Sequence, residues 1–187
     1  FKVLLDYGHN PAAINMIGKF VDQMQVSGRK TAVVTFPGDR TDELIEESVK
    51  LLPKHFTHFI VKQDDNRRGR PSGEVAELIR SLLIKHGTKA ENIEIILDEQ
   101  EAVNKALSSA VEGDYVVVFA DKVSRCWKQI TSFKSTGNVR VKDVDTRADD
   151  HLLERGEVDL IADAISNATM RTDKRGVIIE IEEELND

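Results

Sequence analysis

The feature that most constrains the fold is a regular alternation of short apolar runs with longer stretches whose apolar residues recur at helical spacing. The apolar runs predict five strands, at Lys2–Leu5, Thr31–Phe36, Thr57–Lys62, Ile93–Leu97 and Asp114–Phe119. The longer stretches predict helices at Pro11–Val26, from Thr41 or Asp42 to Lys54, at Ser72–His86, Glu99–Val111 and Asp121–Phe133. A strand-then-helix repeat of this kind builds a parallel sheet with helices on both faces.

Residues 1–134 are therefore predicted to form one α/β domain with a parallel or mostly parallel sheet. Residues 135–187 break the pattern. There the sequence predicts an exposed strand around Val139, Val141 and Val144, a helix at Arg155–Ala168 and a strand at Val177–Ile181. We expect this last third to be a small C-terminal extension that packs on the edge of the sheet.

The composition excludes several classes of protein. Of 187 residues, 40% are hydrophobic and 32% charged, which is typical of a globular and not a disordered chain. The net charge of -7 argues against broad binding to nucleic acid. Apolar runs such as Val116–Ala120 are too short to cross a bilayer, so we predict no membrane partner.

A single cysteine, Cys126, excludes an intrachain disulfide framework and is simplest to explain in the cytoplasm. The first residue is not Met, and the chain opens inside an apolar run. We therefore expect a piece of a longer polypeptide, whose other parts are partners of this one.

Ligands of parallel sheets bind beyond the carboxyl ends of the strands. Four predicted loops share that edge: Asp6–Asn10, Pro37–Arg40, Gln63–Arg70 and Ala120–Arg125. All four are polar or contain glycine, so the edge that they form is where we look for a site.

The first loop stands between a strand and a helix whose start is marked by Asn10 and Pro11. A helix N-terminus suits an anion, Asp6 can accept from sugar hydroxyls, and His9 and Asn10 can donate toward phosphates. The alternative is that Asn10 is only a helix cap and Asp6 only a turn residue.

The loop Asp64–Pro71 carries two carboxylates, an amide and three guanidinium groups. Such a loop suits a zwitterionic amino acid or a chain of alternating charges, because arginine and carboxylates pair bidentately. The alternative is a solvated charge run. In the loop after the second strand, Asp39 and Arg40 either form a plain turn or support a loop beside a ligand.

Other candidates are weaker. Ser124, Arg125 and Cys126 have no His or Asp at a spacing that makes a nucleophile triad. No metal site is predicted, because four histidines are scattered without metal-ligand spacing: His55, His58, His86 and His151. The sequence has neither G-x-x-x-x-G-K-[ST] nor G-x-G-x-x-G. If the domain works with ATP, it does not hold the β- and γ-phosphates by itself.

These blocks, taken together, resemble the C-terminal domain of the Mur ligase family, which includes peptidoglycan-building ligases, folylpolyglutamate synthetases and cyanophycin synthetases. The resemblance covers about residues 1–130 and is strongest to the cyanophycin synthetases. It implies an α/β fold that is Rossmann-like, with a mostly parallel sheet of about six strands and helices on both faces. It rests on Leu4–Ile14, Phe36–Ile45, Val61–Arg70, Gly73–Ile79 and Gly113–Arg125. Arg67 stands where one Mur ligase has proline in an Asp-Asn-Pro-Arg loop that binds the incoming amino acid, so the loop need not bind the same substrate.

The resemblance implies an ATP-dependent acid–amino-acid ligase, in which ATP converts a carboxylate to an acyl phosphate that an amine then attacks. It implies ATP and Mg²⁺ as cofactors, held mainly by a central domain that is not in this chain, so the fragment alone should be inactive. The implied substrates are arginine and an aspartate-containing polymer, and the parent enzyme is expected to be a homo-oligomer.

The resemblance also implies residue roles. For ATP these are Asp6 at the ribose, Tyr7 beside the base, and His9 and Asn10 facing the phosphates. For arginine or the acidic polymer they are Asp64, Asp65, Arg67 and Arg68, with Asp39 and Arg40 supporting the site. Two alternatives stay open: another Mur-type or polyglutamate ligase with a different amine, and an α/β binding module without catalysis.

Overall fold

The computed structural model describes residues 1–133, 169–173 and 176–180. These residues fall in two units, and each is described by itself. The first contains the α/β sheet domain. The second contributes a hairpin in which β6 (Thr169–Asp173) pairs antiparallel with β7 (Gly176–Glu180).

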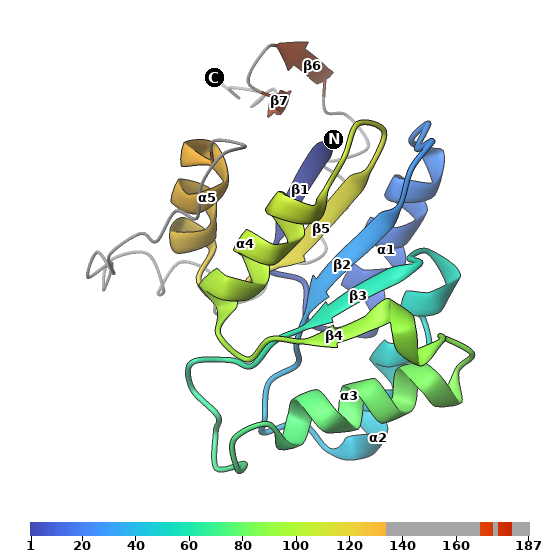
Figure 1. Cartoon of the computed structure of the whole chain (residues 1–187), viewed down its shortest axis with the longest axis vertical. Helices are drawn as coiled ribbons and strands as arrows, with labels where there is room; N and C mark the ends of the chain where they lie inside the picture. The colour runs from blue at the N-terminus through green and yellow to red at the C-terminus, as the bar shows by residue number, and fades with distance from the viewer. Residues whose placement is uncertain (134–168, 174–175, 181–187) are drawn as a thin grey trace, which may run out of the picture. The chain divides into compact units, whose positions relative to one another are not determined.

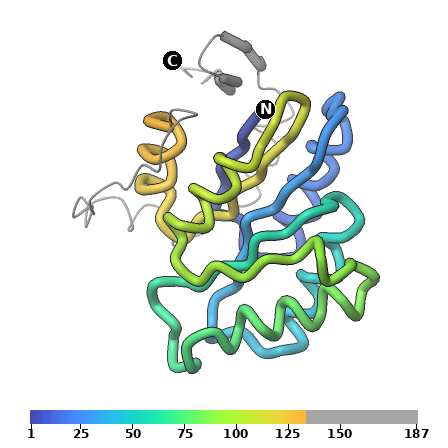
Figure 2. Tube along the Cα trace, in the orientation of Figure 1, coloured from blue at the N-terminus to red at the C-terminus, as the bar shows by residue number. Residues whose placement is uncertain are grey.

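The sheet of the first unit is wholly parallel. Its five strands are β1 (Lys2–Asp6), β2 (Lys30–Val34), β3 (His58–Val61), β4 (Ile93–Ile95) and β5 (Tyr115–Phe119). Their order across the sheet is β1-β5-β2-β3-β4 (Figure 1). The last strand along the sequence thus returns between the first two, and β1 and β5 run side by side (Figure 2). All five carboxyl ends lie on one side, the carboxyl edge, and the amino ends form the opposite amino edge.

Helices cover both faces of the sheet (Figure 1). On one face lie α1 (Pro11–Gln23), α2 (Asp42–Val49) and α3 (Glu74–Lys85), and on the other α4 (Glu99–Ser109) and α5 (Val123–Ser132). Short 3₁₀ turns stand at Leu52–Lys54 and Ala90–Asn92. Neighbouring residues of one strand serve opposite faces, as strand geometry requires: Val34 packs in the α1–α3 core and Val33 in the α4–α5 core.

The predicted fold class is confirmed, with five strands in the described sheet against about six expected. The predicted helix to Lys54 is too long, because α2 ends at Val49 and a separate 3₁₀ turn follows. Pro53 lacks the N–H that a continuous helix would bond to the carbonyl of Val49. The helix predicted from Ser72 starts later, because Gly73 is the cap of α3, with a φ of 80° that favours glycine.

The expectation that α1 runs to Val26 is also wrong, since the helix ends at Gln23 and Met24 is extended. In the last third, the strand predicted at Val177–Ile181 is confirmed over residues 177–180 by β7. The strand predicted around residues 139–144 and the helix at 155–168 lie outside the described residues. The boundary at 134/135 and the packing of the extension stay predictions.

Candidate functional site

The loops at the carboxyl edge meet around a small open pocket. It is lined by residues that follow β1, β2, β3 and β5, together with the last residue of β5: Tyr7, Gly8, His9, Thr35, Pro37, Asp64, Phe119, Ala120 and Asp121. The chain leaves β1 toward one face of the sheet and leaves the adjacent β5 toward the other. Such a switch point is where ligands bind in open α/β sheets, so the pocket is the candidate site.

The loop that follows β1, residues 7–10, which we call the β1 loop, is held in a turn by the side chains of Asp6 and Asn10. Asp6 Oδ1 accepts a hydrogen bond from the Gly8 N–H. Asn10 Oδ1 accepts from the Ala13 N–H at 2.9 Å and thereby caps α1, with Pro11 in the first turn. The cap predicted at Asn10 is therefore confirmed. Burial raises the pKa of Asp6 above its ordinary value, although the Gly8 bond and the charge of His9 act the other way.

Tyr7 and His9 stand together at the rim of the pocket. Their rings pack edge to face with centroids 4.9 Å apart, and His9 Nδ1 lies 3.3 Å from the Tyr7 carbonyl oxygen. Tyr7 is 41% exposed, so part of its ring faces solvent. An exposed aromatic ring next to a helix N-terminus can take a flat base beside an anion.

Asp64 is the least satisfied charge of the pocket. It is 8% exposed, and no described residue donates a hydrogen bond to its carboxylate. Burial raises its pKa to about 6, helped by the negative charges of Asp121 and Glu99 and opposed by Lys62 and Arg68. The buried Oγ1 of Thr35 also lacks a partner. Buried polar groups usually have a hydrogen-bond partner, so a ligand or water in the open pocket is expected to supply one here.

Behind the pocket lies a cluster of three charged side chains, Lys62, Glu99 and Arg125, which we call the Glu99 cluster. The Glu99 carboxylate is fully buried, 3.0 Å from Lys62 Nζ and 2.6 Å from Arg125 Nη2. It also accepts from the backbone N–H groups of Asp121 and Lys122, at 2.7 and 3.3 Å. Burial would raise the pKa of Glu99, but these partners lower it to about 2.

Arg125 links this cluster to the loop that follows β3, Gln63–Arg70, which we call the β3 loop. Its Nη1 and Nη2 donate to the two carboxylate oxygens of Asp65, at 2.8 and 3.2 Å. The Asp65 N–H donates in turn to Asp121 Oδ2 at 3.1 Å. Asp64 and Asp65 are neighbours in the sequence, yet one lines the pocket and the other is bound to the protein itself.

Arg68 and Asp39 join the β2 and β3 loops by an exposed ion pair, Nη1 to Oδ2, of 2.9 Å. Arg68 has a positive φ of 48°, and its backbone N–H donates to Asn66 Oδ1. Its guanidinium lies near enough to Asp64 and Tyr7 for both to act on its pKa, which is raised chiefly by the hydrogen bond to Asp39.

Arg70, to which sequence reasoning assigned no role in the site, also connects these two loops. Its Nε donates to the Gly38 carbonyl and its Nη2 to the Arg40 carbonyl, at 3.0 and 2.8 Å. It also pairs with Asp42 and Glu74. The side chains of Arg40 and Arg67 are exposed, so Arg40 takes part here through its backbone.

The structure thus brings the predicted residues of four loops to one edge, and it adds residues that sequence reasoning missed: Thr35, Lys62, Glu99, Asp121 and Arg125. Four of these stand within a few residues after a strand, which is the signal that could have found them. Cys126 is buried beside this cluster and burial raises the pKa of its thiol, which fits packing and not reactivity.

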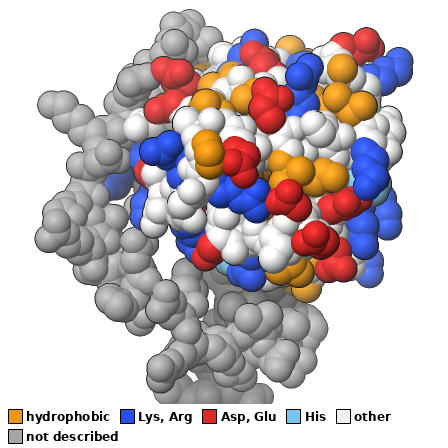
Figure 3. All heavy atoms as spheres, turned by 90° about the horizontal axis from the view of Figure 1, so that it is seen from below, with side chains coloured by type: hydrophobic (Ala, Val, Ile, Leu, Met, Phe, Trp, Pro, Cys, Tyr) orange, Lys and Arg blue, Asp and Glu red, His pale blue; other side chains and the backbone are white. Residues whose placement is uncertain are grey.

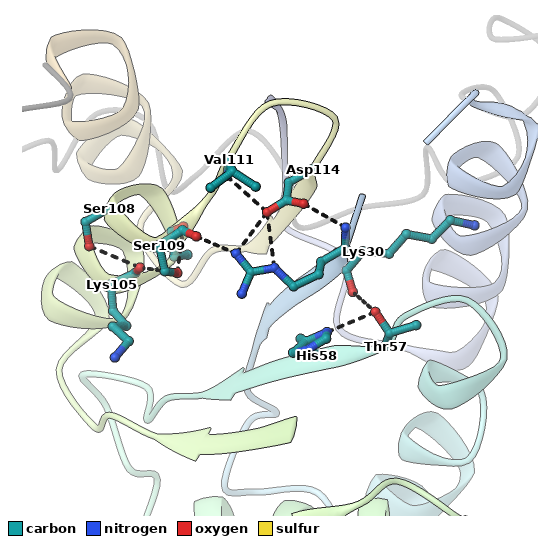
Figure 4. Close-up of polar contacts among 10 residues, drawn as sticks. Lys30, Thr57, His58, Lys105, Ser108, Ser109, Val111 and Asp114 are labelled. Carbon is teal, nitrogen blue, oxygen red and sulfur yellow. Dashed lines mark hydrogen bonds and ion pairs between the residues drawn. The ribbon is translucent and has the colours of Figure 1, made fainter. Parts of the chain in front are cut away.

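The amino edge of the sheet carries a different arrangement. The Asp114 carboxylate accepts from the N–H, Nε and Nη2 of Arg29, at 2.7, 3.2 and 3.0 Å, and from the Val111 N–H at 3.1 Å (Figure 4). Arg29 Nη2 also donates to the Ser109 carbonyl. Burial alone would raise the pKa of Asp114, but these donors lower it below its ordinary value. This group is satisfied entirely by the protein.

The surface charge, the metal-ligating residues and the helix lengths add little to the assignment of the site. The face in Figure 3 interleaves Lys and Arg with Asp and Glu and shows no broad area of one charge. In the part of the chain that the structure describes, no cluster of three or more His, Cys, Asp or Glu side chains could hold a metal ion. None of the described helices has the length and apolar character needed to span a membrane.

Comparison with known proteins gives consistent results. Residues 1–121 match the family described as Mur ligase, glutamate ligase domain. The chain is 39% identical over 137 residues to the cyanophycin synthetase of Synechocystis sp. and 42% identical over 130 residues to that of Nostoc sp.. These alignments cover 73% and 70% of this chain but 15% and 14% of the relatives, so the chain spans only about a seventh of their length.

Solved structures share the fold. One is a UDP-N-acetylmuramoyl-L-alanyl-D-glutamate–2,6-diaminopimelate ligase, with a TM-score of 0.50 and 26% identity over 65% of this chain and 24% of that one. Another is FolC of E. coli in complex with ADP, with a TM-score of 0.54 and 21% identity over 68% of this chain and 28% of that one.

Proposed function

Because the chain belongs to the Mur ligase family, we propose that it is the domain of an ATP-dependent amide ligase that presents an amine to an activated carboxylate. In such a reaction ATP supplies the phosphoryl group that makes the carboxylate an acyl phosphate. The amine nitrogen then attacks the carbonyl carbon, phosphate leaves, and the nitrogen loses a proton. The acceptor-rich pocket around Asp64 carries this proposal.

The amine would approach the pocket from the side of Asp64 and Asp121. Asp64 has no donor in the described protein, and Thr35 Oγ1 is unpartnered beside it. A carboxylate with a pKa of about 6 is largely ionised at neutral pH and can accept hydrogen bonds from an ammonium or guanidinium group. Arg68, whose guanidinium lies near enough to Asp64 to affect its pKa, would hold the α-carboxylate of the same molecule, and the exposed Arg67 would meet an acidic polymer.

The nucleotide would lie at the β1 loop. The exposed ring of Tyr7 suits the base, and no described residue donates to Asp6 Oδ2, so that oxygen is available for a ribose hydroxyl. His9 faces the same pocket. Asn10 uses its side-chain oxygen for the cap, so it would act on phosphates through the helix N-terminus that it shapes. These residues fit ATP without holding its β- and γ-phosphates. Magnesium and those phosphates would be bound by other parts of a longer polypeptide.

For the substrates we propose arginine and an aspartate-containing polymer, because the relatives that are 39% and 42% identical are cyanophycin synthetases. The role that sequence reasoning gave to Asp65 changes in this proposal. Since Asp65 is held bidentately by Arg125, it would fix the loop, while Asp64 meets the substrate. Asp39 and Arg40 would support the loop from the β2 side. We propose that the enzyme is cytoplasmic and forms a homo-oligomer.

The test uses the full-length gene product that contains residues 1–187, with ATP, an aspartate polymer and each amino acid in turn. We expect ATP-dependent amide formation with arginine. Asp64→Asn should raise the KM for arginine about tenfold or more while the KM for ATP stays within about twofold, and Asp6→Ala should do the reverse. Activity with a diamino acid in place of arginine would assign another Mur-type ligase. No amide product with any amino acid would leave a binding module.

A further inference from the structure

A buried cluster of ions, such as the one that joins β3, α4 and α5, costs free energy of solvation. Lys62 and Glu99 have no exposed side-chain surface, and Arg125 is 11% exposed. Removing such charges from water costs several kcal/mol for each ion, and apolar side chains of the same volume often replace them without loss of stability. Stability alone therefore does not account for the Glu99 cluster.

The contacts of the Glu99 cluster indicate another role. Glu99 is the first residue of α4, Lys62 follows β3, and Arg125 lies on α5. Glu99 holds both cations: Arg125 also binds Asp65 in the β3 loop, and the positive charge of Lys62 lowers the pKa of Asp64. Asp121, whose N–H is bound to Glu99, accepts from the Asp65 N–H. The start of the loop is thus fixed at Asp65 by two contacts, and the partner in each of them is itself bound to Glu99.

We propose that Glu99 is a positioning residue for the incoming amine. Through Arg125 it sets the path of the β3 loop at Asp65, and through Lys62 it sets the charge around Asp64, so that Asp64 points into the pocket. This inference rests on the proposed function, since it assigns the amine to the pocket. A displacement of a binding group by about 1 Å can lower a rate about a hundredfold, so the effect should be measurable.

The experiment compares two variants of the full-length gene product with a matched control at the opposite edge. Glu99→Gln keeps the side-chain shape but removes the charge that holds Lys62 and Arg125. Arg125→Lys keeps the charge but cannot pair bidentately with Asp65, and it serves if Glu99→Gln does not fold. Asp114→Asn is the control, because it weakens the contact of a buried carboxylate with an arginine outside the site.

We expect Glu99→Gln to raise the KM for the amine about tenfold or more, and Arg125→Lys about threefold or more, with the KM for ATP within about twofold of the parent. The control should lower the melting temperature and leave the ratio of the two KM values unchanged. Equal rises in both KM values, or an unchanged KM for the amine in Arg125→Lys, would overturn the inference while the proposed function stands. A parent protein that forms no amide would overturn both.

Discussion

The two edges of the sheet treat a buried aspartate in opposite ways. At the amino edge, Asp114 is surrounded by donors from Arg29 and Val111, and its pKa is lowered below its ordinary value. At the carboxyl edge, Asp64 is buried to a similar degree but has no donor, and its pKa is raised to about 6. The first arrangement completes the fold. The second leaves a carboxylate that faces the pocket without a donor from the described residues, and this difference is how we distinguish scaffold from site.

The carboxyl edge contains both kinds of carboxylate. Glu99 accepts from two backbone N–H groups and pairs with two cations, whereas no described residue donates to Asp64, although both contribute to the same loops. The Glu99 cluster therefore acts as scaffold for the site, much as Asp114 does for the opposite edge. The comparison predicts that the effect of a substitution on stability depends on whether the carboxylate has donors within the protein, and not on the edge at which it lies.

The largest expected effect is the loss of a satisfied and fully buried carboxylate. Glu99→Ala leaves Lys62 as a buried charge without its partner, and we expect the free energy of unfolding to fall by about 3–5 kcal/mol. Asp114→Ala should cost less, about 2–3 kcal/mol, because Arg29 is 40% exposed and can be solvated. Urea denaturation of the 187-residue chain measures both. A loss under about 1 kcal/mol for Glu99→Ala would contradict the account of the cluster.

A smaller effect of opposite sign is expected for the unsatisfied carboxylate. The folded pKa of Asp64, about 6, lies above the ordinary value of 3.8. The stability that its protonated form contributes is thus fully present below about pH 4 and is lost as the pH rises through 6. Asp64→Asn, which stays neutral, should be more stable than the parent by about 1–3 kcal/mol at pH 7.5.

Melting temperatures of Asp64→Asn and the parent, taken between pH 4 and pH 8, check this prediction. The difference should grow with pH and nearly vanish at pH 4. A variant that is less stable than the parent at pH 7.5 would mean that the protein itself satisfies Asp64.

The smallest effect is expected in the β3 loop itself. The ion pair of Arg68 with Asp39 is exposed, so Arg68→Ala should change the free energy of unfolding by less than about 1 kcal/mol. Arg68→Gly should be at least as stable as Arg68→Ala, because glycine adopts the positive φ of this position without strain. Urea midpoints of the two variants decide this. A larger loss for glycine than for alanine would argue against the left-handed backbone at residue 68.

Much of the fold was predictable because helical and strand periodicity report directly on burial. The parallel order of the strands then placed four polar loops on one edge, and that inference led to the β1 and β3 loops. The errors arose where local chemistry overrides periodicity, as at Pro53 and Gly73.

The details of the site were less predictable. Nothing in a single sequence shows that Lys62 and Glu99, 37 positions apart, meet in the interior, since charged residues beside apolar runs usually face water. Arg125 was considered only as a neighbour of a weak nucleophile. The opposite orientations of Asp64 and Asp65 depend on the contact of Asp65 with Arg125, which only the folded chain brings together.

The measurement that tests the central claim most directly is the titration of the Asp64 and Asp114 carboxyl groups by carbon-detected NMR in the 187-residue chain. The account predicts that Asp64 titrates with a midpoint near 6 and that Asp114 titrates below its ordinary value of 3.8. A midpoint for Asp64 at or below 3.8 would show that its carboxylate is already satisfied by the protein. The pocket at the carboxyl edge would then lack the unpaired charge on which its assignment as an amine site depends.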